Sequence, residues 1–455
     1  MAFDLADIDP VWAWSPFEPT ATCPWDVGSA AHLYRRAGFG ANFEQLRDAV
    51  QQPPDAVVRQ LIDCQEPTAF RDEVDGLAQA MVNTGQVRNL SAVWLHRMMA
   101  TPHQLLEKMT FFWHGHFATS AGKVTDAQLM LVQHQLLRRH ALGRFDRLVQ
   151  EISRDPAMLI YLDSDSNRKS NPNENYAREL MELFCLGEGN YTEQDIREIA
   201  RCFTGWQVRR KQFRLNRYQH DAGTKTIFGK SGEFSGDDAI RIVLEQPSAP
   251  QFVAAKLVRF LVFDRQQIPH RLLEPLARQL RENDFQVAPV IGRILGSQLF
   301  YSEHAVAQKI RSPVELGCGL LRALEGTTNT LRLAEQLDEL GQALFFPPNV
   351  KGWDGGRTWI NSATLLGRAN LVYQLLHSEK TRFAGGSLET LLERHGISQS
   401  HDLVDWLEQV LLAVRIPGEV RQQLARLGGT GQKIDAESAI AVVYAVCTLP
   451  EFQLN

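Results

Sequence analysis

The stretch DSDSNRKSNPNENYARELMELF, residues 163–184, contains the pattern from which the fold class can be predicted. Asn173 is a residue type that favours the N-cap position of a helix. At about 3.6 residues per turn, the charged side chains that follow gather on one side of that helix: Glu174, Arg178, Glu179 and Glu182. Tyrosine, alanine, leucine, methionine and phenylalanine fill the other side. The stretch therefore predicts an amphipathic helix with a buried apolar face and a Glu174–Arg178 pair on its polar face.

The first half of the same stretch has the spacing of a calcium-binding loop. Asp163, Asp165, Asn167 and Glu174 stand at the first, third, fifth and twelfth positions of an EF-hand pattern. The sixth position, where such a loop needs glycine for its sharp turn, is Arg168. We therefore expect no EF-hand here. A looser site for a hard cation on Asp163, Asp165 and Glu174 is the alternative.

Beyond this stretch, most of the chain also has the apolar spacing of helices. Thr192 begins one predicted helix, and Asn361 or Ser362 begins another after the Gly- and Pro-rich loop 345–359. Residues 206–230 instead combine β-branched and aromatic residues with turn residues, which is typical of a β-hairpin. The sequence thus predicts a mainly α fold: a large multi-helix domain with a small β-hairpin or sheet insertion near 206–230.

The pattern divides the chain into three parts. Residues 1–28 are rich in proline, tryptophan and aspartate without helical spacing, and we expect them to form an extended N-terminal arm. Residues 29–380 are the predicted main helical domain with its β insertion. Residues 381–455 are expected to form a C-terminal helical segment, either packed on the main domain or semi-separate from it.

Composition argues against several classes of protein. Hydrophobic residues make up 44% of the 455 residues and charged residues 22%, which are ordinary globular values. The net charge of −5 argues against a nucleic-acid partner, and no apolar run is long enough to predict a membrane span. Six cysteines lie apart without a C-x-x-C pair, and the N-terminal residues lack a secretory signal pattern. These features predict a cytoplasmic protein.

Histidines near the acidic helix suggest a metal centre. His114 and His116 stand on either side of Gly115, which we expect to end the preceding helix, so that both imidazoles share one face of an extended segment. His220 and Asp221 follow at a predicted turn. With the glutamates, this set has ligand chemistry suited to a divalent transition metal. The alternative is that the histidines are buried and each makes one hydrogen bond. A helix that continued through Gly115 would direct the two imidazoles about 200° apart.

Arg35 and Arg36 are adjacent in the sequence HLYRRAGFG, residues 32–40. Such a pair either binds an anion or clamps glutamate side chains, and we favour the second interpretation.

Eight segments of the chain form a recognisable series. They are HLYRRAGFG (32–40), FFWHGHFATS (111–120), DPAMLIYLD (155–163), NPNENYARELMELFCLG (171–187), YTEQDIREIARCFTGW (191–206), HDAGTKTIFG (220–229), RSPVEL (311–316) and PPNVKGWDGGRTWINSATLL (347–366). In this order they resemble the bacterial family called domain of unknown function 1800. The resemblance implies a large, mostly helical domain, and it implies no established activity or catalytic residue.

Two features of that family concern the location and the partners of this protein. Its members are often secreted, and their genes often neighbour a protein that looks like a sulfatase or alkaline phosphatase with its own export signal. The resemblance therefore implies an alternative to the cytoplasm, in which this chain is exported together with such a partner.

Two functional hypotheses follow from the sequence. In the first, the protein is an enzyme, hydrolytic or oxidative, with Glu174, Arg178, Glu179 and Glu182 as catalytic residues and His114, His116, His220 and Asp221 as metal ligands. A metal-free version of this hypothesis uses a glutamate of raised pKa as general acid or base. In the second, the same polar groups form a closed hydrogen-bond network, and the protein is a non-catalytic scaffold for the sulfatase-like partner.

Overall fold

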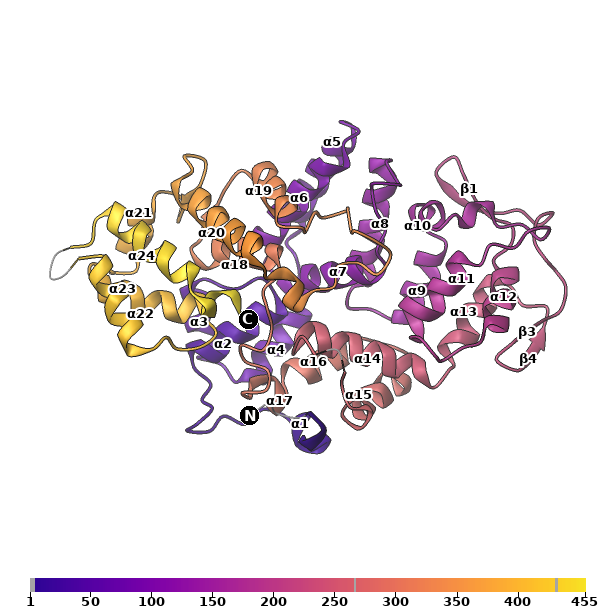
Figure 1. Cartoon of the computed structure of the whole chain (residues 1–455), viewed down its shortest axis with the longest axis horizontal. Coiled ribbons are helices and arrows are strands. Elements are labelled where there is room, and N and C mark those ends of the chain that lie inside the picture. Colours follow the sequence, from indigo (N-terminus) through magenta and orange to yellow (C-terminus); the bar gives the residue numbers. More distant parts are fainter. Residues whose placement is uncertain (1–4, 266, 430–432) are drawn as a thin grey trace.

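The predicted helical pattern matches the computed structural model, in which α-helices dominate the chain. The structure describes residues 5–265, 267–429 and 433–455, and within these ranges the strands form only two-stranded antiparallel sheets. The prediction of a mainly α fold with a small β insertion is confirmed. Figure 1 shows an elongated molecule: α9 to α13 and their hairpins lie at one end, and α20 to α24 lie at the other.

The middle of the molecule is built from both halves of the chain (Figure 1). Its N-terminal helices are α2 (Val27–Ala37), α3 (Phe43–Ala49), α4 (Pro54–Asp63), α5 (Thr68–Val82), α6 (Val87–Ala100), α7 (Gln104–His116) and α8 (Ala127–His140). Its later helices are α14 (Ser248–Leu261), α15 (His270–Glu282), α16 (Ala288–Leu295), α17 (Gln298–Tyr301), α18 (Pro313–Ala323) and α19 (Thr330–Glu339). Segments far apart in the sequence therefore share one core.

One end of the molecule holds the acidic helix and the β insertion. Its helices are α9 (Phe145–Ser153), α10 (Pro156–Tyr161), α11 (Asn175–Glu179), α12 (Glu193–Cys202) and α13 (Gly236–Leu244). The insertion is two hairpins, β1 (Trp206–Arg209) with β2 (Gln212–Leu215) and β3 (Lys225–Ile227) with β4 (Lys230–Gly232). Arg210 and Lys211 both have positive φ between β1 and β2, as the tightest right-twisting hairpin turn requires.

The other end is the C-terminal helical segment, which contacts the middle of the molecule. It comprises α20 (Ser362–His377), α21 (Leu388–Arg394), α22 (Ser400–Leu411), α23 (Gly418–Leu427) and α24 (Ala436–Thr448), with β6 (Arg382–Phe383) pairing to β5 (Gly326–Thr327). Contacts join α22 to α2 and to α18. Whether this segment is a domain of its own stays a prediction.

The N-terminal arm packs along the middle helices. It contains a short helix, α1 (Pro10–Ala13), so it is not extended throughout. The indole N–H of Trp14 donates to the carbonyl oxygen of Leu272 at 2.6 Å, and the ring of Phe17 stacks on Tyr301 with centroids 4.1 Å apart. Both side chains are buried, whereas Trp12 is 40% exposed. Trp14 and Phe17 therefore anchor the arm.

Helix α7 lies at the centre, and the core surrounds it on nearly every side. Almost all of its residues are buried, including the charged Glu107 and Lys108. Each of these has a partner from a distant segment: Arg138 bonds Glu107 at 2.6 Å, and Glu315 bonds Lys108 at 2.5 Å. A buried charge is tolerated when it is paired in this way.

No helix in the described part of the chain is both long and apolar enough to span a membrane.

Candidate functional site

The acidic helix forms where the sequence predicts it. The Asn173 side chain accepts a hydrogen bond from the backbone N–H of Asn175 at 2.9 Å, which caps the first turn of α11. Glu174 and Arg178 form the predicted pair, 3.4 Å apart. The apolar face packs into the core through Tyr176 and Leu180, among others. The predicted amphipathic helix is confirmed.

The helix does not continue as a regular α-helix. After Glu179 it becomes a π-helix, Leu180–Cys185, which carries Glu182 and packs beside α14. A π-helical turn changes the angle at which later side chains leave the helix, so Glu182 is not placed as a regular α-helix would place it. Such turns occur often at functional sites.

Three of the four predicted catalytic residues are bound by neighbours, and Glu174 is one of them through its pair with Arg178. Arg178 donates through both terminal nitrogens to the carboxylate of Glu193, each at 2.9 Å, so its guanidinium is already occupied. Glu182 accepts a hydrogen bond from the Tyr191 hydroxyl at 3.1 Å. Burial and the Glu182 carboxylate together raise the pKa of Tyr191 to about 12, so this hydroxyl is a proton donor at neutral pH.

Glu179 differs from these neighbours. Its side chain is half-buried, and no hydrogen bond or ion pair joins it to any residue that the structure describes. Burial raises its pKa above the usual value, and the nearby Glu182 carboxylate raises it further. The ammonium of Lys351 and the guanidinium of Arg178 oppose this rise only in part.

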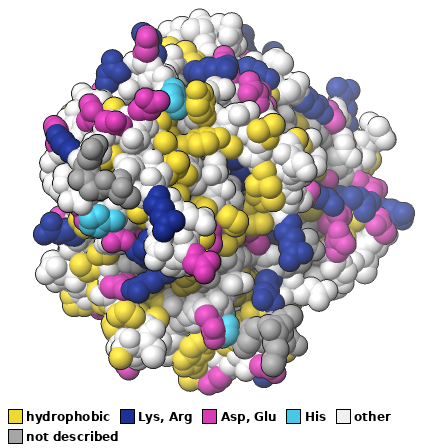
Figure 2. Space-filling model, turned by 60° about the vertical axis from the view of Figure 1, so that its left-hand side comes forward, with side chains coloured by type: hydrophobic (Ala, Val, Ile, Leu, Met, Phe, Trp, Pro, Cys, Tyr) yellow, Lys and Arg dark blue, Asp and Glu magenta, His cyan; other side chains and the backbone are white. Residues whose placement is uncertain are grey.

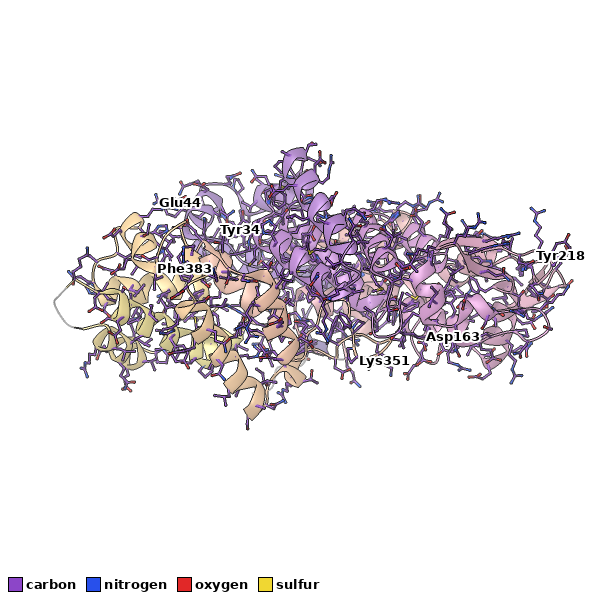
Figure 3. The ribbon with its side chains drawn as sticks, turned by 90° about the horizontal axis from the view of Figure 1, so that it is seen from above. Tyr34, Glu44, Asp163, Tyr218, Lys351 and Phe383 are labelled. Carbon is purple, nitrogen blue, oxygen red and sulfur yellow. The ribbon has the colours of Figure 1, made fainter. Side chains whose placement is uncertain are left out.

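Lys351 acts electrostatically on Glu179 and also on a second lysine, Lys256. Lys256 lies on α14, where its Nζ is 5.1 Å from the centre of the Phe252 ring. Burial, then Arg259 and Lys351, lower the pKa of Lys256 to about 8. Lys351 is exposed on the loop 345–359, near the middle of the long axis (Figure 3). We call Glu179, Glu182, Tyr191, Lys256 and Lys351 the carboxylate–lysine cluster.

The predicted end of the histidine-bearing helix is wrong. Helix α7 continues through Gly115 to His116, so the two imidazoles leave it in different directions. His114 is buried against Trp94 and Trp353, and its Nε2 accepts the backbone N–H of Phe345 at 3.1 Å. Burial lowers the pKa of His114 to about 4, so it is neutral at neutral pH.

His116 points to the other side of α7. Its Nε2–H donates to the carbonyl oxygen of Phe184 at 3.0 Å, which attaches α7 to the π-helix. Its Nδ1 is buried without a hydrogen-bond partner among the described residues. Burial, with Lys256 adding to it, lowers the pKa of His116 to about 3. The alternative interpretation, buried histidines with one hydrogen bond each, describes His114 and His116 correctly.

His220 and Asp221 lie apart from these histidines. His220 Nδ1 lies 2.9 Å from the carbonyl oxygen of Thr204, and Asp221 is paired with Arg201 at 2.7 Å. Figure 3 shows Tyr218, just before His220, at one end of the long axis. Within the described ranges, no three His, Cys, Asp or Glu side chains form a group that could hold a metal ion. The four predicted ligands are therefore not brought together.

The calcium-like spacing also has a structural explanation. Asp163 adopts a left-handed backbone with φ of 56° and pairs with Lys123 at 2.7 Å. Asn167 is buried, where it accepts the backbone N–H of Asn173 and donates to the carbonyl oxygen of Ala200. These residues shape the loop before α11 rather than converge on one point.

Sequence reasoning missed Lys256, Lys351 and Tyr191. A signal existed for Lys256, which is the one charge within the apolar run FVAAKLV, residues 252–258. A lysine at such a position is either half-buried or paired, and here it is half-buried. Nothing in the local sequence pairs Lys351 with Glu179, because they meet only through tertiary contacts.

The fold and this cluster define a mainly helical protein in which the Glu179 carboxylate has no ion-pair partner among the described residues. The family model described as protein of unknown function (DUF1800) matches residues 32–454, and the chain belongs to that family. No curated protein and no solved structure matches the chain.

Proposed function

We propose that this protein is an enzyme in which Glu179 acts as a general acid–base on a substrate with an anionic group. One observation carries the proposal: the charge of Lys351 acts on both Glu179 and Lys256, yet none of the three side chains forms an ion pair with a residue that the structure describes. Polar side chains around them, such as Arg178 and Glu182, are paired. Groups left unpaired in this way are available to a ligand.

The chemistry of the three side chains supports this role. A general acid–base is most effective when its pKa lies near the working pH, and burial moves the pKa of Glu179 in that direction. Lys256, with a pKa of about 8, is partly neutral near physiological pH, and a bound anion would favour its charged form. Lys351 supplies a second positive charge from the loop.

This proposal revises the roles expected from the sequence. Arg178 was predicted to be a catalytic residue, but Glu193 occupies its guanidinium, so Lys256 and Lys351 are the cations that we propose for binding the anionic group. Hydrolysis is the reaction we propose, because its proton transfers need only a carboxyl group and water. The side chains of this proposed site come from α11, the π-helix, α14 and the loop 345–359.

Replacing Glu179 with glutamine is expected to stabilise the protein at neutral pH and to leave its stability unchanged in acid. The folded pKa of Glu179 lies above the ordinary value of 4.5, so the folded state holds its proton more tightly than the unfolded state does. Stability is therefore lost as pH rises through this window, and the glutamine variant is free of that loss. Urea unfolding of wild type and Glu179→Gln at about pH 4 and about pH 7 measures the difference.

The matched control is Glu174→Gln, which changes a half-buried glutamate on the polar face of the same helix that is already paired with Arg178. In assays with chromogenic phosphate, sulfate and carboxylate esters, Glu179→Gln should lower kcat by at least about 100-fold, whereas Glu174→Gln should retain activity. Equal pH dependence of stability in wild type and Glu179→Gln would show that the carboxyl is not held in a destabilising site, and would remove the proposal.

We infer a second candidate function from the surface of α20, namely a scaffold that docks the sulfatase-like or alkaline-phosphatase-like partner expected from the sequence. Leu366 is 64% exposed and Tyr373 is 51% exposed on this helix, with Leu365 beside them. Arg368 is the only Lys, Arg, Asp or Glu in α20, and it is buried. Figure 2 shows hydrophobic side chains gathered on the face that includes this end of the molecule. An exposed apolar helix face without charge is typical of interface cores.

The docking candidate predicts that Leu366→Asp weakens binding of the purified partner by at least about 10-fold. Titration calorimetry with the purified sulfatase-like protein measures this affinity. The control is Val11→Asp, because Val11 is 78% exposed on α1, away from α20. If both variants bind like wild type, α20 is not the docking face.

A further inference from the structure

Two arginine-rich segments of the chain lie in opposite environments. Arg35 and Arg36 of α2 are buried, and Arg36 donates to the carbonyl oxygen of Ala305 at 2.7 Å. No glutamate side chain in the described ranges bonds either arginine, so the predicted clamp is not formed. The hairpin of β1 and β2 is the opposite case, because its arginines are exposed. These exposed arginines are accessible to a partner.

One face of this hairpin packs against the protein. Alternate residues of a strand point to opposite faces, and the antiparallel register places four apolar side chains on the same face: Trp206, Val208, Phe213 and Leu215. The Trp206 ring is buried, and the guanidinium of Arg154 lies 5.8 Å from its centre. The apolar face therefore attaches the hairpin to the neighbouring elements.

The opposite face is polar, and all of its charges are positive. It carries Gln207, Arg209, Gln212 and Arg214. The last three of these are exposed. No aspartate or glutamate occurs between residues 206 and 219. The hairpin thus presents to solvent a face without negative charge.

Exposed cations without an ion pair gather on and beside the hairpin. They are Arg168, Lys169, Arg209, Arg210, Arg214 and Arg217, and none forms an ion pair with a residue that the structure describes. The backbone N–H of Lys169 donates to the carbonyl oxygen of Gln219 at 2.9 Å, which holds the loop 167–171 beside the hairpin. We call these six residues the basic hairpin surface.

Carboxylates at this end of the molecule do not balance the basic hairpin surface. Those nearest in the fold are paired with other cations: Asp126 with Lys211, Asp163 with Lys123, and Asp237 with Arg154. In residues 145–244, the exposed carboxylates without an ion pair are Asp165, Glu188 and Glu233. Asp165 lies in the 3₁₀ helix Ser164–Ser166, which contacts β1. The basic hairpin surface therefore keeps an excess of positive charge.

The turn of the hairpin places cations at its tip in a strained backbone. Arg210 has a φ of 53° and Lys211 a φ of 62°. Asn-Gly is the pair that usually occupies such a turn, because asparagine and glycine tolerate positive φ. Arg-Lys is less favourable for the backbone but adds two positive charges at the tip. Strain of this kind is typical of functional segments.

The position of the hairpin suits a flat partner. The hairpin lies at one end of the long axis, where Figure 3 shows Tyr218 (Figures 1 and 3). Tyr218 is 87% exposed and Leu215 is 41% exposed. Tyrosine prefers the headgroup region of a bilayer, and anionic lipids attract clusters of lysine and arginine. A membrane can contact this end without approaching the rest of the chain, whose net charge of −5 would oppose the contact.

We propose that the basic hairpin surface binds the surface of a membrane that contains anionic phospholipids. The guanidinium groups bond lipid phosphates, which they match with paired N–H donors. Tyr218 and Leu215 enter the headgroup region beside them. Nucleic acid is the less suitable polyanion, because the chain as a whole is acidic. This inference is independent of the proposed enzyme activity.

The first test measures flotation of the full chain with lipid vesicles. Wild type should float with vesicles of phosphatidylglycerol and phosphatidylcholine but not with phosphatidylcholine alone, and added salt should release it. The variant Arg209→Gln/Arg214→Gln/Arg217→Gln should bind the anionic vesicles at least about 10-fold more weakly. Wild type that binds both kinds of vesicle equally overturns the proposal. So does wild type that binds a DNA duplex but not the anionic vesicles.

A matched control removes the same charge from another place. Arg271, Arg278 and Arg281 are exposed on α15 and form no ion pair with a residue that the structure describes. Replacing all three with glutamine should leave vesicle binding within about 2-fold of wild type, because salt screens charges far from the membrane. If this control loses as much binding as the hairpin variant, net charge rather than the basic hairpin surface is responsible, and the proposal is overturned.

The second test uses a variant that should fold at least as well as wild type. Arg210→Asn/Lys211→Gly installs the favoured turn, and the exposed pair of Lys211 with Asp126 that it removes contributes little. Its thermal unfolding midpoint should therefore rise, whereas its binding to anionic vesicles should fall. A midpoint that falls would show that the Arg-Lys turn serves stability and would count against the proposal. Unchanged vesicle binding would overturn it.

Discussion

Replacing Glu315 with glutamine is expected to destabilise the protein by about 3–5 kcal/mol, the usual effect of breaking a buried ion pair. Glutamine keeps the shape of the side chain and can still accept the backbone N–H of Ser312, which Glu315 accepts at 2.8 Å. What is lost is the charge opposite Lys108, whose ammonium is 1% exposed. The cost arises because Lys108 is left charged and unpaired in the core. Urea unfolding at neutral pH measures it.

Two comparisons give this prediction its specificity. The double variant Lys108→Met/Glu315→Gln should recover most of the lost stability, because no unpaired charge remains. Glu335→Gln, at an exposed glutamate of α19 that pairs with Arg332, should change stability by no more than about 0.5 kcal/mol. If Glu315→Gln behaves like Glu335→Gln, the pair with Lys108 does not contribute as described.

The same pair predicts a dependence on pH. Burial alone would raise the pKa of Glu315, but the ammonium groups of Lys108 and Lys309 hold it at about 2, below the ordinary 4.5. The unfolded state therefore binds this proton more readily, so stability is present above the ordinary pKa and is lost as pH falls towards 2. The glutamine variant should lack this component of acid unfolding.

Replacing Gly352 with alanine is expected to destabilise the protein by about 2–5 kcal/mol. Gly352 has a φ of +78°, a conformation that alanine adopts only with strain. A methyl group there would also lie inside contact distance of the backbone carbonyl oxygen of Gly115, which cannot move without disturbing α7. The loop that carries Lys351 and Trp353 would be pushed away from the histidine end of that helix.

Gly355 provides the control for this prediction. It lies on the same loop with a φ of +74°, and a methyl group there would meet no atom within 4 Å. Gly355→Ala therefore measures the backbone strain alone, which we expect to be about 1–2 kcal/mol. Urea unfolding of both variants separates strain from collision. Equal losses would mean that the loop does not press on Gly115.

Features that depend on neighbours along the chain were predictable. Thr192 and Asn361 cap α12 and α20 as expected, because a capping side chain bonds a backbone N–H only a few residues away. The Glu174–Arg178 pair lies one helical turn apart, and the hairpins of the β insertion follow from turn residues between strand-like runs. The buried face of α11 follows from its apolar spacing.

The candidate site was predictable only in part. Glu179 was expected from the polar face of its helix, but its raised pKa depends on burial and on Glu182 in the π-helical turn, while Lys351 of a distant loop opposes the rise. The expectation for the histidines failed at Gly115. Glycine in a helix is unfavourable by only about 1 kcal/mol, so the packing of α7 in the core is enough to carry the helix through it.

The amino-acid sequence by itself therefore predicted where the helices and hairpins lie, which faces are apolar and which family the chain resembles. Each of these features depends on residues that are close together in the sequence. The partners of the buried charges could not be predicted from the sequence. Lys108 meets Glu315, Arg36 meets the carbonyl oxygen of Ala305, and Glu179 meets Lys351 only after distant helices pack. Burial and pairing set the energy and the pKa of such groups, and both are properties of the assembled core rather than of any one segment.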